Sequence, residues 1–114
     1  MVVQAGPCGP INHTEVFTAI HKTVASVFPI TTGHRASIPS FGSVWGFVVG
    51  SSRHDPQTLA SEEVNNRLAE RGVTSLRFYD GLTHQGIFAL PKYVRASLEK
   101  EERLITSENP VFAV

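Results

Sequence analysis

Residues 38–47 read Ile-Pro-Ser-Phe-Gly-Ser-Val-Trp-Gly-Phe, and this stretch predicts a β-hairpin. Pro39–Ser43 is a turn-forming cluster between two extended segments, residues 31–38 and residues 44–52. Because the connection is short, we expect the two segments to pair as antiparallel strands. The second segment is apolar on both faces, which predicts a covered strand in the interior of a sheet.

A helix over residues 13–28 is expected before this hairpin. Asn12 and Glu15 have the spacing of a capping box, apolar residues recur at helical spacing, and Pro29 ends the segment. The apolar stripe of this helix needs a broad surface to pack on, most simply the sheet.

The first ten residues combine a β-forming run with a loop. Met1–Gln4 has the composition of the end of a strand, and Ala5–Pro10 is rich in Gly and Pro. On these residues alone, a frayed tail is an equally good interpretation of Met1–Gln4.

Two further helices are expected after the hairpin. One covers residues 62–71, with Ser61 as its cap and Gly72 as its stop. The other covers residues 91–102 and begins at Pro91, with a possible ion pair between side chains one turn apart, Glu99 and Arg103.

The segments around these helices carry weaker signals. Ser75–Tyr79 is a short strand candidate, Asp80-Gly81 is a turn signal, and residues 82–89 are ambiguous. The tail from Ile105 to Val114 is expected to be ordered if Val111 and Phe112 dock on the core.

Composition narrows the class of protein. The 114 residues fit one domain or part of one, and 10 Lys plus Arg balance 10 Asp plus Glu. The absence of a basic cluster argues against nucleic-acid binding. No apolar run approaches the ~18 residues of a membrane span, and no signal peptide is visible. We therefore expect no membrane partner and residence in the cytoplasm.

Histidine and cysteine invite hypotheses about chemistry. The chain has five histidines: His13, His21, His34, His54 and His84. Their spacing does not match that of known metal-ligand motifs, so separate structural roles are the better interpretation and no metal site is expected. The single cysteine, Cys8, excludes an intramolecular disulfide. A helix dipole after Cys8 would lower its thiol pKa, but no signature pairs it with a base, so catalysis by Cys8 is not expected.

Two aromatic residues flank the flexible turn, Phe41 and Trp45. They are either the core of a hairpin or an aromatic wall for an apolar or cationic ligand, because ring faces attract ammonium groups by ~0.5–2 kcal/mol. On the residues alone both interpretations stay open.

The stretch at residues 38–47 also resembles the segment that closes the polyamine pocket in spermidine synthase-like aminopropyltransferases. Other segments agree with that family in order and spacing, and together they span nearly the whole chain: Val2–Gln4, His13–Pro29, Glu63–Arg67, Leu76–Gly81 and His84–Pro91.

The resemblance implies an α/β fold that is the C-terminal half of a methyltransferase-like Rossmann fold. It would be a single partial domain over residues 1–114, with a short sheet that ends in an antiparallel hairpin and has flanking helices. The family transfers an aminopropyl group from decarboxylated S-adenosylmethionine to a di- or triamine. The amine must be neutral to attack, and acidic residues take its proton.

Only substrate-binding residues carry over from the resemblance. These are Gln4, as a hydrogen-bonding group near the amine, and Phe41, at the pocket aromatic, with Trp45 beside it. Many members that use putrescine have tyrosine at the position of Phe41, so the missing hydroxyl points to other or longer amines. The family's glycine-rich loop and its catalytic Asp-x-x-Asp-Pro motif would precede Met1, so no cofactor and no catalytic residue is assigned to this chain.

The resemblance also predicts a partner. The strand at residues 44–52 would lie between Met1–Gln4 and residues 31–38, which leaves an apolar edge on the first strand. Such an edge is a template for pairing, so we expect a homo-oligomer or a complementing N-terminal half. The chain alone is expected to be inactive. The alternatives are a non-catalytic polyamine- or partner-binding module from a split or truncated gene, and a truncated chain with no activity.

Overall fold

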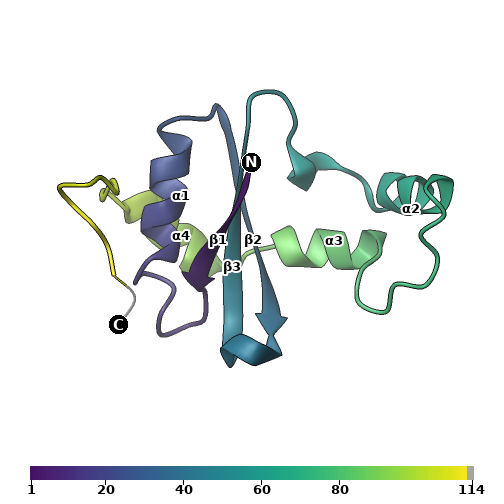
Figure 1. The fold of residues 1–114 in the computed structure, drawn as a ribbon, viewed down its shortest axis with the longest axis horizontal. Helices are drawn as coiled ribbons and strands as arrows, with labels where there is room; N and C mark the ends of the chain where they lie inside the picture. The colour runs from purple at the N-terminus through teal and green to yellow at the C-terminus, as the bar shows by residue number, and fades with distance from the viewer. Residues whose placement is uncertain (113–114) are drawn as a thin grey trace.

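A three-stranded antiparallel sheet in the order β1-β3-β2 stands at the centre of the fold (Figure 1). The computed structural model describes residues 1–112. Helices α1 and α4 lie on one side of the sheet, and α3 and α2 extend from the other side (Figure 1). The elements are β1 Val2–Pro7, α1 Phe17–Ala25, β2 Ile30–Ile38, η1 Pro39–Phe41, β3 Ser43–Ser51, η2 Pro56–Thr58, α2 Ser61–Glu70, α3 Gly81–Phe88 and α4 Lys92–Lys100.

The hairpin is confirmed as the organising element. β2 and β3 pair without interruption from Ile30 opposite Ser51 to Ile38 opposite Ser43. The short helix η1 closes the tip, and Gly42 follows it at φ 73°, a left-handed conformation that glycine adopts without steric cost. β3 is the central strand, as predicted.

The contact between α1 and the sheet depends on a glycine in β3. A Cβ built on Gly46 would lie 2.3 Å from a ring carbon of Phe17, which is fully buried. Phe17 packs in one core with Ala5, Val48 and Val94. The predicted packing of this helix on the sheet is therefore confirmed.

The helix itself begins later than predicted. It starts at Phe17 and ends at Ala25, and its N-cap residue Val16 makes no side-chain capping bond. The predicted capping box is wrong because the Asn12 side chain accepts a hydrogen bond from the Gly9 backbone N–H instead, at 3.0 Å. This local bond closes a turn over residues 9–12, which competes with helix formation there.

The first strand is longer than the sequence indicated. β1 runs to Pro7, with an irregularity in its pairing between Gln4 and Pro7. Gly6 lies in this irregular stretch at φ 78°. Within residues 1–112, β1 has β3 as its one neighbour in the sheet, so its outer edge is unpaired.

The structure differs from the sequence predictions in and around helices α2 and α3. Ser75–Tyr79 forms no strand, because no other strand lies alongside it among the described residues, and Leu76 and Phe78 are exposed. Asp80 caps α3 by accepting a hydrogen bond from the Thr83 N–H, so the ambiguous segment at residues 82–89 is mostly helix. Ser61 is the first residue of α2 and not its cap, which is Ala60.

Helices α2 and α3 form an arm, residues 61–88, that projects from the sheet (Figure 1). Helix α3 packs on β2, and α2 packs chiefly on α3. The two helices approach closely at Gly81, where a Cβ would lie 2.0 Å from the Ser61 carbonyl oxygen.

The end of the chain also differs from the sequence prediction. Helix α4 ends at Lys100, so Glu99 and Arg103 are not one helical turn apart, and Arg103 pairs with Glu101 instead. Phe112 is 73% exposed and does not dock on the core. Val114 lies outside the described residues.

Candidate functional site

The face of the sheet opposite α1 carries the predicted site residues. Side chains alternate between the two faces of a strand, and Ala5 and Val48 belong to the core on the α1 side. Gln4 lies opposite Phe47 in the register of β1 and β3, so both belong to the other face. Trp45 is two residues from Phe47 and therefore shares that face.

Phe41 completes an aromatic pair at the hairpin tip. Its ring centroid lies 4.5 Å from that of Trp45, with an angle of 42° between the planes. Phe41 is 44% exposed, while Trp45 is partly buried. The tip is therefore both a packed hairpin and an accessible aromatic surface. The indole N–H of Trp45 is buried and has no hydrogen-bond partner among residues 1–112.

The structure adds Phe47 and His34 to this face. His34 lies opposite Phe47 in the register of β2 and β3, and the two rings stack at 5.2 Å and 16°. His34 also contacts the ring of Phe88 from α3 at 4.8 Å. Burial, with a further contribution from nearby His84, lowers the pKa of His34, which favours the neutral imidazole. The Nδ1 of His34 is buried and has no hydrogen-bond partner in the part of the chain that the structure describes.

His84 links this ring cluster to the base of the arm. Its Nε2 lies 2.6 Å from the Pro56 carbonyl oxygen, which only accepts, so Nε2 carries the proton. Nδ1 therefore accepts from the Tyr79 hydroxyl at 2.7 Å. Both ring nitrogens of His84 are occupied, which gives this histidine a structural role.

Cys8 is not an activated thiol. It is fully buried, and burial raises its pKa to about 11, although the nearby Arg35 guanidinium acts in the opposite direction. The expected lowering by a helix dipole is wrong because the helix begins only at Phe17.

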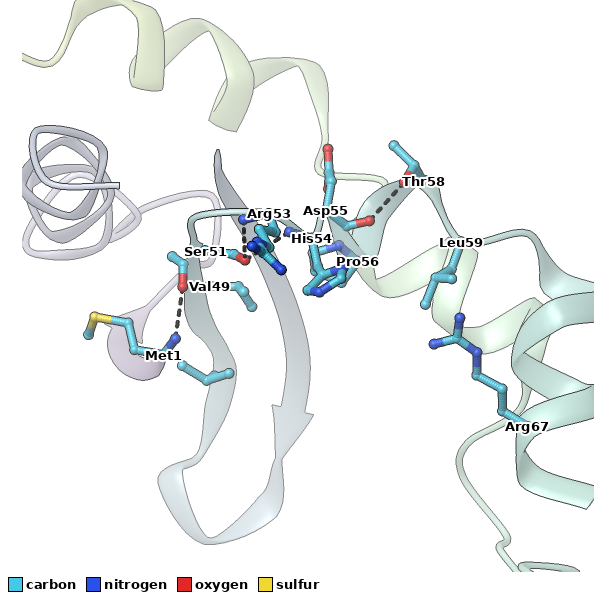
Figure 2. Close-up of a pocket in the computed structure, with 12 residues that line it drawn as sticks. Met1, Val49, Ser51, Arg53, His54, Asp55, Pro56, Thr58, Leu59 and Arg67 are labelled. Carbon is cyan, nitrogen blue, oxygen red and sulfur yellow. Dashed lines mark hydrogen bonds between the residues drawn. The ribbon is translucent and has the colours of Figure 1, made fainter. Parts of the chain in front are cut away.

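A hollow of about 540 Å³ opens at the other end of the strands, between the start of β1 and the segment that leads to α2 (Figure 2). Arg53, His54, Asp55 and Arg67 line it together with apolar residues. Gln4, Phe41 and Trp45 do not line this hollow. The predicted site is instead on the open sheet face and the hairpin tip.

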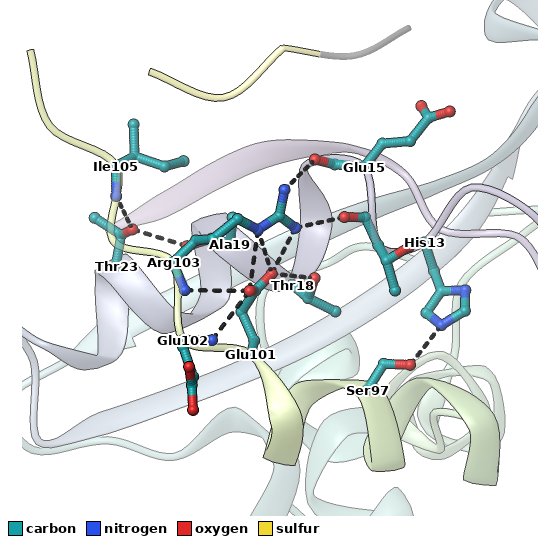
Figure 3. A network of polar contacts seen from close by, with 11 residues as sticks. His13, Glu15, Thr18, Ala19, Thr23, Ser97, Glu101, Glu102, Arg103 and Ile105 are labelled. Carbon is teal, nitrogen blue, oxygen red and sulfur yellow. Dashed lines mark hydrogen bonds and ion pairs between the residues drawn. The ribbon is translucent and has the colours of Figure 1, made fainter. Parts of the chain in front are cut away.

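A polar network fastens the segment after α4 to α1 (Figure 3). The Glu101 carboxylate accepts hydrogen bonds from the Thr18 hydroxyl at 2.7 Å and from the Arg103 guanidinium at 2.6 Å. Arg103 also donates to the backbone carbonyls of Thr14 and Glu15. The Arg103 bonds hold the pKa of Glu101 at about 2. This network serves the fold and lies away from the predicted site residues.

Residues 1–112 contain neither a metal-ion cluster nor a membrane-spanning helix. No group of three or more His, Cys, Asp or Glu side chains in residues 1–112 is arranged to hold a metal ion. None of the helices in this part of the chain is long and apolar enough to cross a membrane.

Sequence reasoning missed Phe47 and His34. A usable signal was present, because the short turn fixes the register of the hairpin and the period of two places Phe47 on the same face as Trp45. The position of His34 opposite Phe47 follows from the same register.

Comparisons with known proteins identify relatives of this chain. No protein-family model matches it. It is 44% identical over 97 residues to the polyamine aminopropyltransferase of Sulfurisphaera tokodaii, across 85% of this chain and 32% of the relative. It is 40% identical over 111 residues to the polyamine aminopropyltransferase of Sulfolobus acidocaldarius, across 97% of this chain and 36% of the relative. The chain thus spans about a third of the length of these curated relatives.

Solved structures show the same fold. The spermidine synthase from Thermotoga maritima aligns with a TM-score of 0.68 at 22% identity, over 88% of this chain and 34% of that one. A spermidine synthase in complex with the transition state analogue AdoDATO aligns with a TM-score of 0.66 at 21% identity, over 88% of this chain and 32% of that one. The predicted fold class and the resemblance are confirmed.

Proposed function

We propose that this chain, which is similar over a third of their length to the polyamine aminopropyltransferases, provides the polyamine-binding side of such an enzyme. The complete enzyme would transfer an aminopropyl group from decarboxylated S-adenosylmethionine to a di- or triamine. The observation that carries the proposal is the shared placement of Gln4, Phe41 and Trp45. One amide and two aromatic rings stand on one sheet face and its hairpin tip.

This chemistry suits an alkylamine. The Gln4 side chain is exposed and offers both a carbonyl oxygen and an N–H₂ group for hydrogen bonds to an amine. The exposed ring of Phe41 offers an apolar surface for methylene groups and a π face for an ammonium group. Phe41 lacks the hydroxyl that tyrosine would contribute, which favours an acceptor longer than putrescine.

The chain alone is expected to have no transferase activity. Decarboxylated S-adenosylmethionine is the co-substrate that we propose for the complete enzyme, and no residue of this chain is assigned to it or to removal of the amine proton. Residence in the cytoplasm stays a prediction from the sequence.

A complementation assay tests the proposal. The chain is co-expressed with the part of the Sulfolobus acidocaldarius relative that the alignment leaves uncovered, and methylthioadenosine release is measured with spermidine and with putrescine. We expect release only when both parts are present, and a lower rate with Gln4→Ala or Phe41→Ala. Release by the chain alone would contradict the assignment. The assignment would also be contradicted if the chain and the relative's uncovered part, expressed together, released no methylthioadenosine, while the two corresponding parts of the relative, expressed together, did.

The unpaired edge of β1 favours a second candidate, a binding module that acts through a partner chain. Val2 is 65% exposed beside this edge, and an exposed apolar edge strand is a template for pairing. We therefore propose a homo-oligomer or a complementing chain. Analytical ultracentrifugation should show mass above the 12.4 kDa monomer at micromolar concentration. A monomer over a wide concentration range would contradict self-association.

A further inference from the structure

Ser97 of α4 and His13 form a hydrogen-bonded pair that the proposed function does not use (Figure 3). The Ser97 hydroxyl oxygen lies 2.8 Å from Nε2 of His13, although the two residues are 84 positions apart in the sequence. A serine inside a helix commonly bonds back to a carbonyl of its own preceding turn. Within residues 1–112, the Ser97 hydroxyl bonds to His13 instead. The pair is therefore a tertiary contact between α4 and the segment that precedes α1.

The neighbours of His13 fix where the protons of this pair lie. Nδ1 of His13 is 3.1 Å from the Gly9 carbonyl oxygen, and a carbonyl only accepts, so Nδ1 carries the proton. In the neutral ring, Nε2 is then the unprotonated nitrogen, and it accepts the hydrogen of the Ser97 hydroxyl. In this arrangement a histidine can act as a general base toward a serine.

The His13 ring is held rigidly in this orientation. It is only 9% exposed, and its backbone N–H donates to the same Gly9 carbonyl at 3.1 Å, so main chain and ring are tied to one acceptor. The ring of Tyr93 packs against it edge to face, with centroids 5.1 Å apart. A base that is oriented by a third group and lies about 2.6–3.2 Å from a hydroxyl is the signature of an activated nucleophile.

Ser97 lines a hollow of about 220 Å³ together with three charged side chains. Two of these are already paired, because Glu101 accepts from Arg103 at 2.6 Å. The third is Lys100, one helical turn after Ser97, which forms no ion pair within residues 1–112. A free ammonium at this place attracts an anionic substrate. It also stabilises the negative oxygen that develops when a carbonyl carbon is attacked.

We propose that Ser97 is a nucleophile activated by His13, which takes an acyl group from an anionic acyl donor of the acyl phosphate class. The Ser97 oxygen attacks the carbonyl carbon, and its proton passes to Nε2 of His13. The bond between the carbonyl carbon and the phosphate oxygen then breaks, and phosphate leaves with that proton. The product is an ester on Ser97. This site lies on the α1 side of the sheet, away from Gln4 and Phe41, so the inference does not depend on the proposed function.

Incubation of the 114-residue chain with acetyl phosphate at neutral pH tests the proposal. Peptide mass mapping locates the acetyl groups, and hydroxylamine distinguishes esters, which it cleaves, from lysine amides, which resist it. We expect about 100-fold more acetyl ester on Ser97 than on the exposed Ser52, the low end of what a general base contributes. His13→Gln should abolish the Ser97 ester.

A second measurement tests the base without an acyl donor, and it decides the role of His13 if His13→Gln does not fold. Ser97→Cys places a thiol beside Nε2 of His13. This thiol should react with iodoacetamide at neutral pH about tenfold faster than the thiol of the matched control Ser52→Cys, because a neighbouring histidine favours the thiolate. Position 52 is the more exposed of the two, so accessibility alone predicts the opposite order. Cys8 is fully buried and present in both variants, so it adds no difference.

Two results overturn the proposal. One is acetyl ester spread over the exposed serines with no preference for Ser97. The other is a thiol at position 97 that reacts no faster than the thiol at position 52, which would mean that the bond between Ser97 and His13 only joins α4 to the segment before α1.

Discussion

Glu101→Gln removes the charge at the centre of the network that ties the C-terminal segment to α1. The side chain of Glu101 is only 9% exposed, and its carboxylate accepts from Thr18 and Arg103. Glutamine has nearly the same size, so the substitution leaves little cavity and tests the charge itself. We expect a less stable protein at pH 7.

The magnitude follows from the pKa of Glu101. A fall from the usual 4.5 to about 2 corresponds to roughly 3.5 kcal/mol at most, at ~1.4 kcal/mol per pKa unit. Arg103 is 45% exposed, and solvent screens an ion pair with such a partner. We therefore expect Glu101→Gln to lower the free energy of unfolding by about 1–2 kcal/mol.

Urea unfolding at several pH values is the assay. At a typical slope of about 1–1.5 kcal/mol per molar urea, the midpoint at pH 7 should fall by roughly 1 M. The folded pKa of Glu101 lies below the unfolded one, so its stabilisation is complete above about pH 4.5 and disappears as the pH falls toward 2. The difference between wild type and variant should shrink over the same range.

Two outcomes would contradict a stabilising charge at Glu101. Equal midpoints at pH 7 would mean that the Glu101 network adds no stability. A difference that stays constant from pH 7 to pH 2 would mean that packing, and not charge, is responsible. Glu108→Gln is the matched control, because it removes an exposed carboxylate from the same C-terminal segment.

Three further predictions concern the core and the ring cluster. Gly46→Ala should destabilise the fold by about 1–3 kcal/mol in urea unfolding, because its Cβ would collide with Phe17; unchanged stability would show that α1 can move away. Cys8 should resist a thiol reagent at pH 8 until the chain unfolds, since its pKa is about 11; rapid labelling of the folded chain would contradict its burial. Tyr79→Phe should cost about 0.5–1.5 kcal/mol through the lost bond to His84, and an unaffected unfolding midpoint would argue against that bond.

The hairpin was predictable because its signals are local. The turn cluster Pro39–Ser43 and the apolar run after it specify two antiparallel strands without any distant partner. The same register places Phe47 opposite His34, and it was available from the sequence. The order of the three strands came from the family resemblance, because composition alone left Met1–Gln4 open between a strand and a tail.

The errors arose where a distant or competing partner decides the local structure. Ser75–Tyr79 has the composition of a strand, but a strand also needs a neighbour, and the described part of the chain offers none. Asn12 has the spacing of a helix cap, but its side chain bonds to Gly9. Arg103 pairs with Glu101 and not with Glu99 because the chain leaves the helix at Lys100. The spacing of two residues in the sequence does not show whether a third residue, or the end of a helix, will give one of them a different partner.

The attachment of the arm implies an order of unfolding. Helix α2 packs chiefly on α3, and α3 meets the sheet through the rings of Phe88 and His34. A unit held by so few contacts opens at a lower free energy than the core beneath α1. Amide hydrogens of residues 61–88 should therefore exchange with solvent through a partial opening that leaves the β2–β3 ladder protected, and a protease should cut the arm before it cuts the sheet.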